Sequence, residues 1–133
     1  MGGDAAWLAL TDYDGTLAPI RPTPGEARLS ATMRAAVRRL SGAPGVTVGV
    51  VSGRSLDAVR RLVRLPGIVY VGNHGLELQG PGVRFVHPGA RRRVPLLRRI
   101  ARQLSQALAG IPGALVESKR LSLSVHWRRV PAR

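Results

Sequence analysis

An apolar run that ends in two aspartates limits what this chain can fold into more than any other feature. Residues 8 to 17 read Leu-Ala-Leu-Thr-Asp-Tyr-Asp-Gly-Thr-Leu, so the run stops at Asp12 and Asp14 and then breaks on Gly15. Because a buried strand cannot hide ionised carboxylates, we expect both aspartates at its carboxyl end, where parallel sheets bind ligands. Two carboxylates at such a place favour a divalent cation.

Strand and helix patterns alternate from this run up to Gly72. Alternation of this kind is typical of βαβ units with a parallel sheet. The second and third strands read as continuous apolar runs, as buried parallel strands do, and Ser30 and Ser55 are placed to cap the two helices. The sequence therefore predicts an α/β fold, with strands over 7–10, 46–51 and 68–71 and helices over 30–40 and 55–65.

The pattern changes after Gly72. A short ribbon is predicted over 76–79 and 83–86, followed by a joint rich in proline, glycine and arginine over 87–95. A basic amphipathic helix and strands over 114–117 and 121–127 follow, and we interpret the helix as one packed on a sheet rather than on a membrane. We therefore predict two domains, residues 1–88 with the aspartate pair and residues 89–133. The apolar face of the helix holds Leu97, Ile100, Ala101, Leu104 and Leu108.

The chain is strongly basic, with 21 Lys and Arg residues against 7 Asp and Glu residues and a formal charge of +14. Such a charge raises the question of nucleic acid. The arginines are scattered over several predicted helices, the 4% of aromatic residues do not interleave with them, and no nucleic-acid-reading motif is present. These observations argue against nucleic-acid binding and favour solvated arginine faces, or a positive field that attracts an anionic substrate.

The sequence carries no membrane or secretory signal. It has no cysteine, and therefore no disulfide and no thiolate metal site. Arginines interrupt every apolar stretch before it reaches the roughly 20 residues of a spanning helix, and no apolar signal segment precedes the first strand. We therefore expect a soluble, cytoplasmic protein without membrane partners.

Asp12 and Asp14 have the residue types of a nucleophile and its acid–base partner. In this interpretation the Asp12 carboxylate accepts a phosphoryl group, while Asp14 protonates the leaving oxygen and later activates water. Gly15 would let backbone N–H groups approach the transferring oxygens closely. The alternative is an ordinary turn of aspartate and glycine after a strand.

Two further motifs follow the second and third strands. Ser52-Gly53-Arg54 supplies a hydroxyl, a glycine that admits close backbone approach, and a planar guanidinium suited to phosphate. Asn73 and His74 follow the third strand between two glycines. Because the carboxyl ends of parallel strands meet at one edge of a sheet, we expect all three motifs there. The alternatives are a serine helix cap and a plain turn.

Apolar and polar side chains alternate in the last predicted strand, so that each kind lies on one face. The polar face is either simply solvated or, together with Glu117 and Lys119, it lines a sugar pocket. The apolar face holds Leu121, Leu123, Val125 and Trp127, and the polar face holds Ser122, Ser124, His126 and Arg128.

Taken together, these motifs resemble one family. Their order over residues 12 to 128 is Asp-Tyr-Asp-Gly-Thr-Leu, Ser-Gly-Arg, Gly-Asn-His-Gly, and Glu-x-Lys followed by His-x-Arg. The chain resembles trehalose-6-phosphate phosphatase of the haloacid dehalogenase superfamily. The resemblance implies Mg²⁺-dependent hydrolysis of trehalose 6-phosphate to trehalose and phosphate, in trehalose biosynthesis. It also implies a partial Rossmann-like haloacid dehalogenase core with three parallel strands, plus part of an α+β cap over residues 89–133.

The resemblance assigns a role to each motif residue. Asp12 matches the nucleophile and a Mg²⁺ ligand, and Asp14 matches the general acid–base residue, whose backbone carbonyl also binds the metal. Positions that contact phosphate or substrate match Ser52, Gly53, Arg54, Asn73 and His74. Cap positions that recognise the disaccharide match Glu117, Lys119, His126 and Arg128.

The family pattern continues beyond the residues present here, with more of the cap, a lysine that balances phosphate charge, and an Asp-rich loop that completes the metal site. We therefore expect an N-terminal fragment with negligible activity alone, since phosphoryl transfer depends on positioning and on neutralised charge. We also expect the first strand to be an exposed edge with an uncovered apolar face. Aggregation, or completion of the sheet by another chain, would follow.

Other functions stay open at this point. One is a catalytically silent module that binds a sugar phosphate or a partner protein. Another is a different sugar phosphatase of the same superfamily. A trehalose-phosphate synthase is the protein partner that the resemblance suggests.

Overall fold

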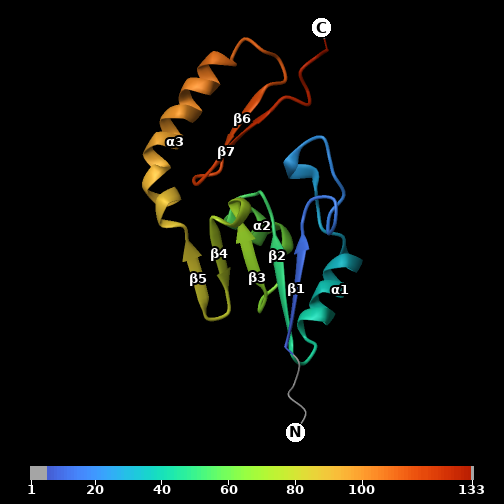
Figure 1. Cartoon of the computed structure of the whole chain (residues 1–133). Coiled ribbons are helices and arrows are strands. Elements are labelled where there is room, and N and C mark those ends of the chain that lie inside the picture. Colours follow the sequence, from blue (N-terminus) through green and yellow to red (C-terminus); the bar gives the residue numbers. More distant parts are fainter. Residues whose placement is uncertain (1–5, 133) are drawn as a thin grey trace. The chain divides into compact units, whose positions relative to one another are not determined.

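Two compact units, each with its own sheet, make up the chain: Met1–Phe85 and Val86–Arg133. The computed structural model describes residues 6–132. In chain order the elements of the first sheet and its helices are β1 (Trp7–Asp12), η1 (Pro24–Glu26), α1 (Ala31–Ser41), β2 (Val46–Val51), α2 (Leu56–Val63), β3 (Val69–Gly72), η2 (Asn73–Gly75), β4 (Glu77–Gly80) and β5 (Val83–Val86) (Figure 1). The second unit contains α3 (Pro88–Ala107), β6 (Leu115–Ser118) and β7 (Leu123–His126).

The sheet of the first unit has the strand order β1-β2-β3-β4-β5. β1 pairs in parallel with β2, and β2 with β3, which confirms the predicted parallel sheet. β3 pairs antiparallel with β4, so the predicted ribbon joins the main sheet. The register opposes Asp12 to Val51 and Val51 to Val71, and the carboxyl ends of the three parallel strands therefore meet at one edge.

The core of the first unit lies between this sheet and its helices. α1 packs on β2, and α2 packs on β3 and β4. Val50 from β2 and Val59 and Val63 from α2 are fully buried, as the apolar runs predict. Both predicted caps are confirmed, because the Ser30 and Ser55 hydroxyls accept the amides of Met33 and Ala58 at 3.1 and 3.3 Å.

β1 is an edge strand, as expected. Only one of its long sides pairs with another strand, β2, among the described residues. Trp7, Leu8 and Leu10 are 68%, 62% and 58% exposed. The face that holds Leu8 and Leu10 is therefore uncovered, whereas Ala9, on the opposite face, packs against the core.

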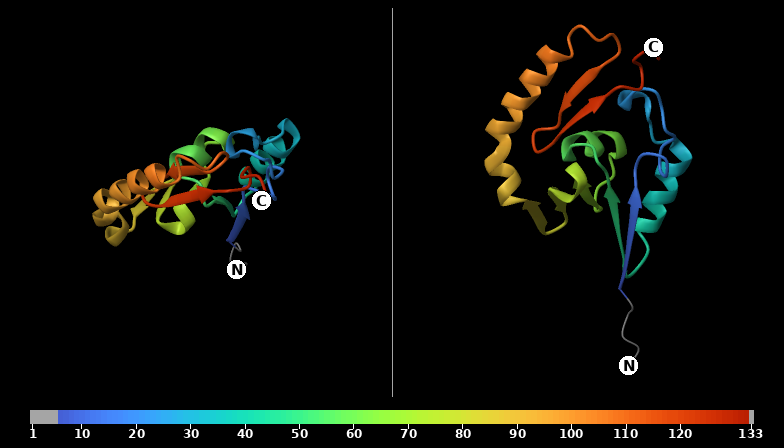
Figure 2. Two further views of the ribbon diagram at one scale, coloured as in Figure 1. Left: turned by 90° about the horizontal axis from the view of Figure 1, so that it is seen from above. Right: turned by 45° about the horizontal axis from the view of Figure 1, so that its top comes forward.

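The second unit consists of a long helix and a two-stranded ribbon. α3 packs along β6, and β6 pairs antiparallel with β7 (Figures 1 and 2). The predicted joint over 87–95 is wrong, because α3 begins at Pro88 and contains Pro95. Proline at the first helical position loses no helical hydrogen bond, and the His87 imidazole caps the helix by accepting the Ala90 amide at 3.3 Å.

The last strand is shorter than predicted and less regular. β7 spans Leu123–His126. The residues of the predicted apolar face differ in burial, because Leu121 is buried, whereas Val125 is 40% and Trp127 76% exposed. The helix face holding Leu97 and Leu104 is half-buried, as predicted. Among the described residues, no helix has both the length and the apolar character needed to cross a membrane.

Candidate active site

Asp12 and Asp14 lie on either side of a buried tyrosine at the end of β1. Tyr13 is fully buried, its hydroxyl donates to the Ala27 carbonyl at 2.8 Å, and its amide donates to the Val51 carbonyl at 3.2 Å. Burial raises the pKa of this phenol, which stays a neutral donor. With Tyr13 anchored inward, Asp12 is exposed and Asp14 half-buried.

Arg54 holds Asp14 through a two-point ion pair. The Arg54 Nε lies 2.9 Å from one Asp14 carboxylate oxygen, and Nη2 lies 2.7 Å from the other. The guanidinium carbon is also 5.4 Å from the centre of the Tyr13 ring, within the range of a cation–π contact. The motif after β2 is therefore joined directly to the motif after β1, as the sequence predicts for the edge.

Ser52 and Gly53 form a tight turn next to the Asp14–Arg54 ion pair. Ser52 is 2% exposed, and its hydroxyl oxygen accepts the Arg54 amide at 3.1 Å. Gly53 leaves room for a close contact that the sequence did not show: a Cβ at this position would lie 2.4 Å from Cε1 of His74. The glycine therefore lets the imidazole of the third motif pack against the second.

Asn73 and His74 adopt left-handed backbone conformations, with φ of 50° and 57°. Such conformations cost energy for residues other than glycine and often mark functional sites. The Asn73 amide donates to the Arg54 carbonyl at 2.7 Å, and the His74 amide donates to the Ser52 carbonyl at 3.2 Å. Asn73 is fully buried, whereas His74 is exposed.

Glu77 belongs to this group of side chains, although the sequence did not single it out. It is 6% exposed, and Oε1 accepts the Leu56 amide at 2.8 Å and the Asn73 side-chain amide at 2.6 Å. The available signal was an acidic residue in a predicted strand, directly after the Asn-His turn. A carboxylate there must either face water or be paired.

The predicted cap residues gather on the ribbon of the second unit. His126 Nε2 lies 2.7 Å from Oε2 of Glu117, and the Lys119 ammonium lies 3.9 Å from the same oxygen. Arg128 is exposed and follows the end of β7. The ribbon therefore brings three of its four predicted residues together in one polar cluster.

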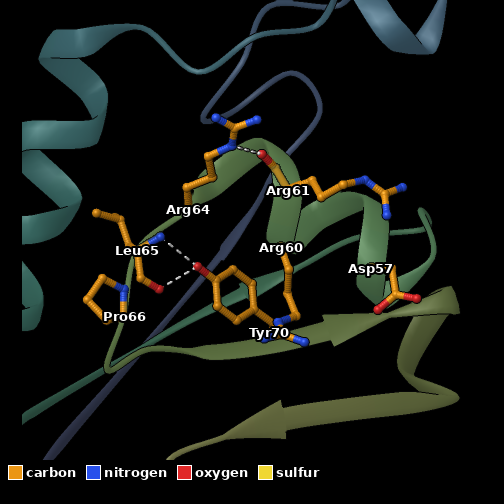
Figure 3. Close-up of a pocket in the computed structure, with 7 residues that line it drawn as sticks. All are labelled: Asp57, Arg60, Arg61, Arg64, Leu65, Pro66 and Tyr70. Carbon is orange, nitrogen blue, oxygen red and sulfur yellow. Dashed lines mark hydrogen bonds between the residues drawn. The ribbon is translucent and has the colours of Figure 1, made fainter.

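A separate hollow of about 510 Å³ lies along α2 and holds none of the predicted site residues. Tyr70 is among its lining residues, and its hydroxyl donates to the Leu65 carbonyl at 2.7 Å and accepts the Leu65 amide at 3.0 Å (Figure 3). The hollow is lined by Asp57, Arg60, Arg61, Arg64, Leu65, Pro66 and Tyr70.

The fold and the strand-end site together define an α/β protein with a carboxylate pair at the carboxyl edge of its parallel sheet. A phosphatase of the haloalkanoate (HAD) enzyme superfamily from Bacteroides thetaiotaomicron shares the fold, with a TM-score of 0.51 over 93% of this chain and 16% identity. The chain belongs to the trehalose-phosphatase family, whose family model matches residues 10–133.

Individual relatives agree with this assignment. A trehalose-phosphate phosphatase of Mycobacterium avium (strain 104) is 43% identical over 88% of this chain and 30% of its own length. A solved structure of a trehalose-6-phosphate phosphatase related protein matches 95% of this chain and 54% of its own chain, with a TM-score of 0.84 and 26% identity. The chain spans about a third of the length of the curated relatives it matches, 34% and 30% in two of them.

Proposed function

We propose that this chain carries the nucleophile and the acid–base residue of a trehalose 6-phosphate phosphatase, an enzyme of trehalose biosynthesis. Family membership supports the reaction class. The observation that carries the site is the two-point pair between Asp14 and Arg54, beside Asp12 at the end of β1. Because the chain spans about a third of its curated relatives, the activity of the whole protein is part of the proposal.

Asp12 is the proposed nucleophile. One carboxylate oxygen attacks phosphorus, the bond from phosphorus to the sugar oxygen breaks, and Asp14 gives its proton to that oxygen, which releases trehalose. Asp14 then takes a proton from water while the water oxygen attacks the aspartyl-phosphate. Phosphate leaves and Asp12 is restored. The exposure of Asp12 supports this role, because a phosphate ester can reach it.

Arg54 and Ser52 have supporting roles in this proposal. The pair with Arg54 orients the Asp14 carboxyl group, which gives a proton in the first step and accepts one in the second. Ser52 is proposed to donate its hydroxyl proton to a phosphate oxygen, with Gly53 allowing close approach. His74 is exposed at the same edge and is proposed to contact the substrate.

Mg²⁺ is the proposed cofactor. It prefers hard oxygen ligands, and the Asp12 carboxylate and the Asp14 backbone carbonyl would hold it, since Arg54 engages the Asp14 carboxylate. Bound there, the ion supplies positive charge that stabilises the transferring phosphoryl group. Within residues 6–132 no cluster of three or more His, Cys, Asp or Glu side chains is suited to a metal, so only two protein ligands are proposed.

The polar cluster of the ribbon is proposed to recognise the disaccharide. Its carboxylate accepts hydrogen bonds and its imidazole and ammonium groups donate them, a mixture suited to sugar hydroxyls. The cluster holds Glu117, Lys119 and His126, and Arg128, which follows the end of β7, is proposed to bind the sugar with them. We also propose a cytoplasmic location, and a trehalose-phosphate synthase as the partner that supplies the substrate.

Phosphate release by the full-length protein tests the proposal. We expect release from trehalose 6-phosphate in the presence of Mg²⁺, and little release from glucose 6-phosphate. Asp12→Asn is expected to abolish it, while Asp57→Asn, the same change at an exposed position of α2, leaves the rate unchanged. Equal rates on both sugar phosphates would instead indicate another sugar phosphatase, and no release from either would indicate a silent binding module.

A further inference from the structure

We propose that Glu77 is a positioning residue that acts through Asn73 and Arg54 on Asp14, the acid–base residue. This inference rests on the proposed function for its catalytic consequence. The contacts that carry it lie within the first unit and need no ligand. They form a series of hydrogen bonds, linked through the backbone and side chains of Asn73 and Arg54, from a buried carboxylate to an exposed edge.

Glu77 is the buried end of this series. A carboxylate that is 6% exposed keeps a charge only where donors are aimed at it. Both donors reach the same oxygen, the Leu56 amide at 2.8 Å and the Asn73 side chain at 2.6 Å. Because both bonds are short and end on one buried oxygen, Glu77 fixes the positions of both partners.

The two partners of Glu77 both lie next to Arg54. Leu56 is close to it in the sequence, and Asn73 is hydrogen-bonded to it. Leu56 is the first residue of α2 and lies two positions after Arg54, so its amide fixes where the helix begins. Gly72 makes this possible, because a Cβ there would lie 2.4 Å from the Leu56 nitrogen. Asn73 donates its backbone amide to the Arg54 carbonyl at 2.7 Å.

The Arg54 side chain in turn orients the Asp14 carboxylate through the hydrogen bonds of 2.9 and 2.7 Å described above. Asn73 belongs to the series rather than to the substrate site, since its side-chain nitrogen donates to Glu77 and its backbone amide to Arg54. Its left-handed backbone, with φ of 50°, is held by the two bonds that it makes. We therefore assign Asn73 to positioning, in contrast to its position in the family resemblance.

A double-mutant cycle on the full-length protein tests the catalytic consequence. Glu77→Gln keeps the shape and removes the charge, and we expect kcat for trehalose 6-phosphate to fall about tenfold or more with little change in KM, as for a small misplacement of a reacting group. Arg54→Lys is expected to lower kcat as well. If Glu77 acts through Arg54, the double variant is no slower than the worse single variant.

The matched control is Glu26→Gln, the same change at an exposed residue of η1. We expect it to leave kcat unchanged and to combine additively with Arg54→Lys. If kcat of the Glu77→Gln, Arg54→Lys double variant falls by the product of the two single losses, Glu77 does not act through Arg54 and the proposal is overturned. A Glu77→Gln variant that loses thermal stability but keeps kcat would assign Glu77 a purely structural role and would overturn it too.

A measurement without substrate separates this inference from the proposed function. In ¹⁵N NMR spectra of the full-length protein without substrate, Glu77→Gln is expected to shift the Asn73 side-chain amide and the Arg54 Nε–H resonance, whereas Glu26→Gln moves neither. If only the Asn73 resonance shifts, the effect of Glu77 does not reach Arg54, which would contradict the proposal. If the parent protein releases no phosphate but both resonances shift, the proposed function fails and the positioning stands.

Discussion

The guanidinium of Arg54 binds the carboxylate of Asp14 at two points, with Nε and Nη2 at 2.9 and 2.7 Å from its two oxygens. The Arg54 side chain is 14% exposed and that of Asp14 39%, so the pair lies at the surface of the edge with its cationic side turned inward. This pairing joins residues that are 40 positions apart in the chain. It fixes the direction of Asp14 before any substrate binds.

Replacing Arg54 with lysine tests whether this geometry matters beyond its charge. Lysine keeps the positive charge but cannot form two parallel hydrogen bonds to one carboxylate. We expect kcat for trehalose 6-phosphate to fall about tenfold or more, since one charged hydrogen bond and the orientation of Asp14 are lost. The assay is phosphate release. Arg38→Lys, a change at an exposed position of α1, serves as the control, and equal rates for parent and Arg54→Lys would refute the role.

Gly53→Ala tests the close packing of the second motif against the third. The added Cβ would lie 2.4 Å from His74 Cε1, so the imidazole must move. Because His74 is exposed and can rotate, we expect the free energy of unfolding to fall by about 1 kcal/mol, the lower end of the range for overpacked positions. Urea denaturation measures it. Gly25→Ala, where a Cβ meets nothing within 4 Å, should change stability by about 0.5 kcal/mol or less, and the packing argument fails if the two variants behave alike.

The two tyrosines predict loss of stability at high pH. Burial raises the pKa of Tyr13 and of Tyr70 above the ordinary 10.0. Because the unfolded chain loses these protons at lower pH than the folded chain, their contribution to the free energy of unfolding is complete below pH 10.0 and is lost as the pH rises through the folded pKa values. Tyrosinate absorbance reports both groups, since the chain has two tyrosines.

In that titration we expect both midpoints above 10.0 in the folded protein and near 10.0 in urea. Tyr70→Phe should remove one of the folded-state midpoints and leave that of Tyr13 in place. A folded-state midpoint at or below 10.0 for either residue would show that burial does not control its ionisation.

The exposed edge strand predicts self-association. Leu8 is 62% exposed on β1, beside unpaired backbone groups that can pair with another strand. We expect light scattering of the 133-residue chain to rise with concentration, and Leu8→Lys to reduce that rise, because a charge on an edge strand opposes pairing. Ile20→Lys removes an equally exposed side chain, 66% exposed, outside any strand. Equal reductions by both variants would assign the association to apolar surface alone.

The parts of the fold that the sequence predicts well are those with local signals. The continuous apolar run of β2 matches its predicted bounds, and serine caps mark the starts of α1 and α2. The joint predicted over 87–95 is wrong, because proline does not end a helix at the positions that it occupies here. Pro88 sits at the first helical position, and Pro95 costs one helical hydrogen bond at an exposed position.

The residues of the candidate site were likewise predictable only where the sequence carries a local signal. Asp12, Ser52 and Asn73 each follow a predicted parallel strand, and the rule that such ends share an edge places them together. Glu77 could not be found by that rule, because its role depends on β4 lying antiparallel beside β3, which opposes Glu77 to Gly72. Pairing between distant segments leaves no local signal in a sequence.

The most direct test of the central claim is the identity of the residue that accepts the phosphoryl group. The full-length protein is mixed with trehalose 6-phosphate, the reaction is stopped with acid, and peptides are examined by mass spectrometry. We predict a phosphoryl group on Asp12 in the parent protein and in Asp57→Asn, and none in Asp12→Asn. A phosphoryl group on another residue, or phosphate release by Asp12→Asn at the parent rate, would contradict the assignment.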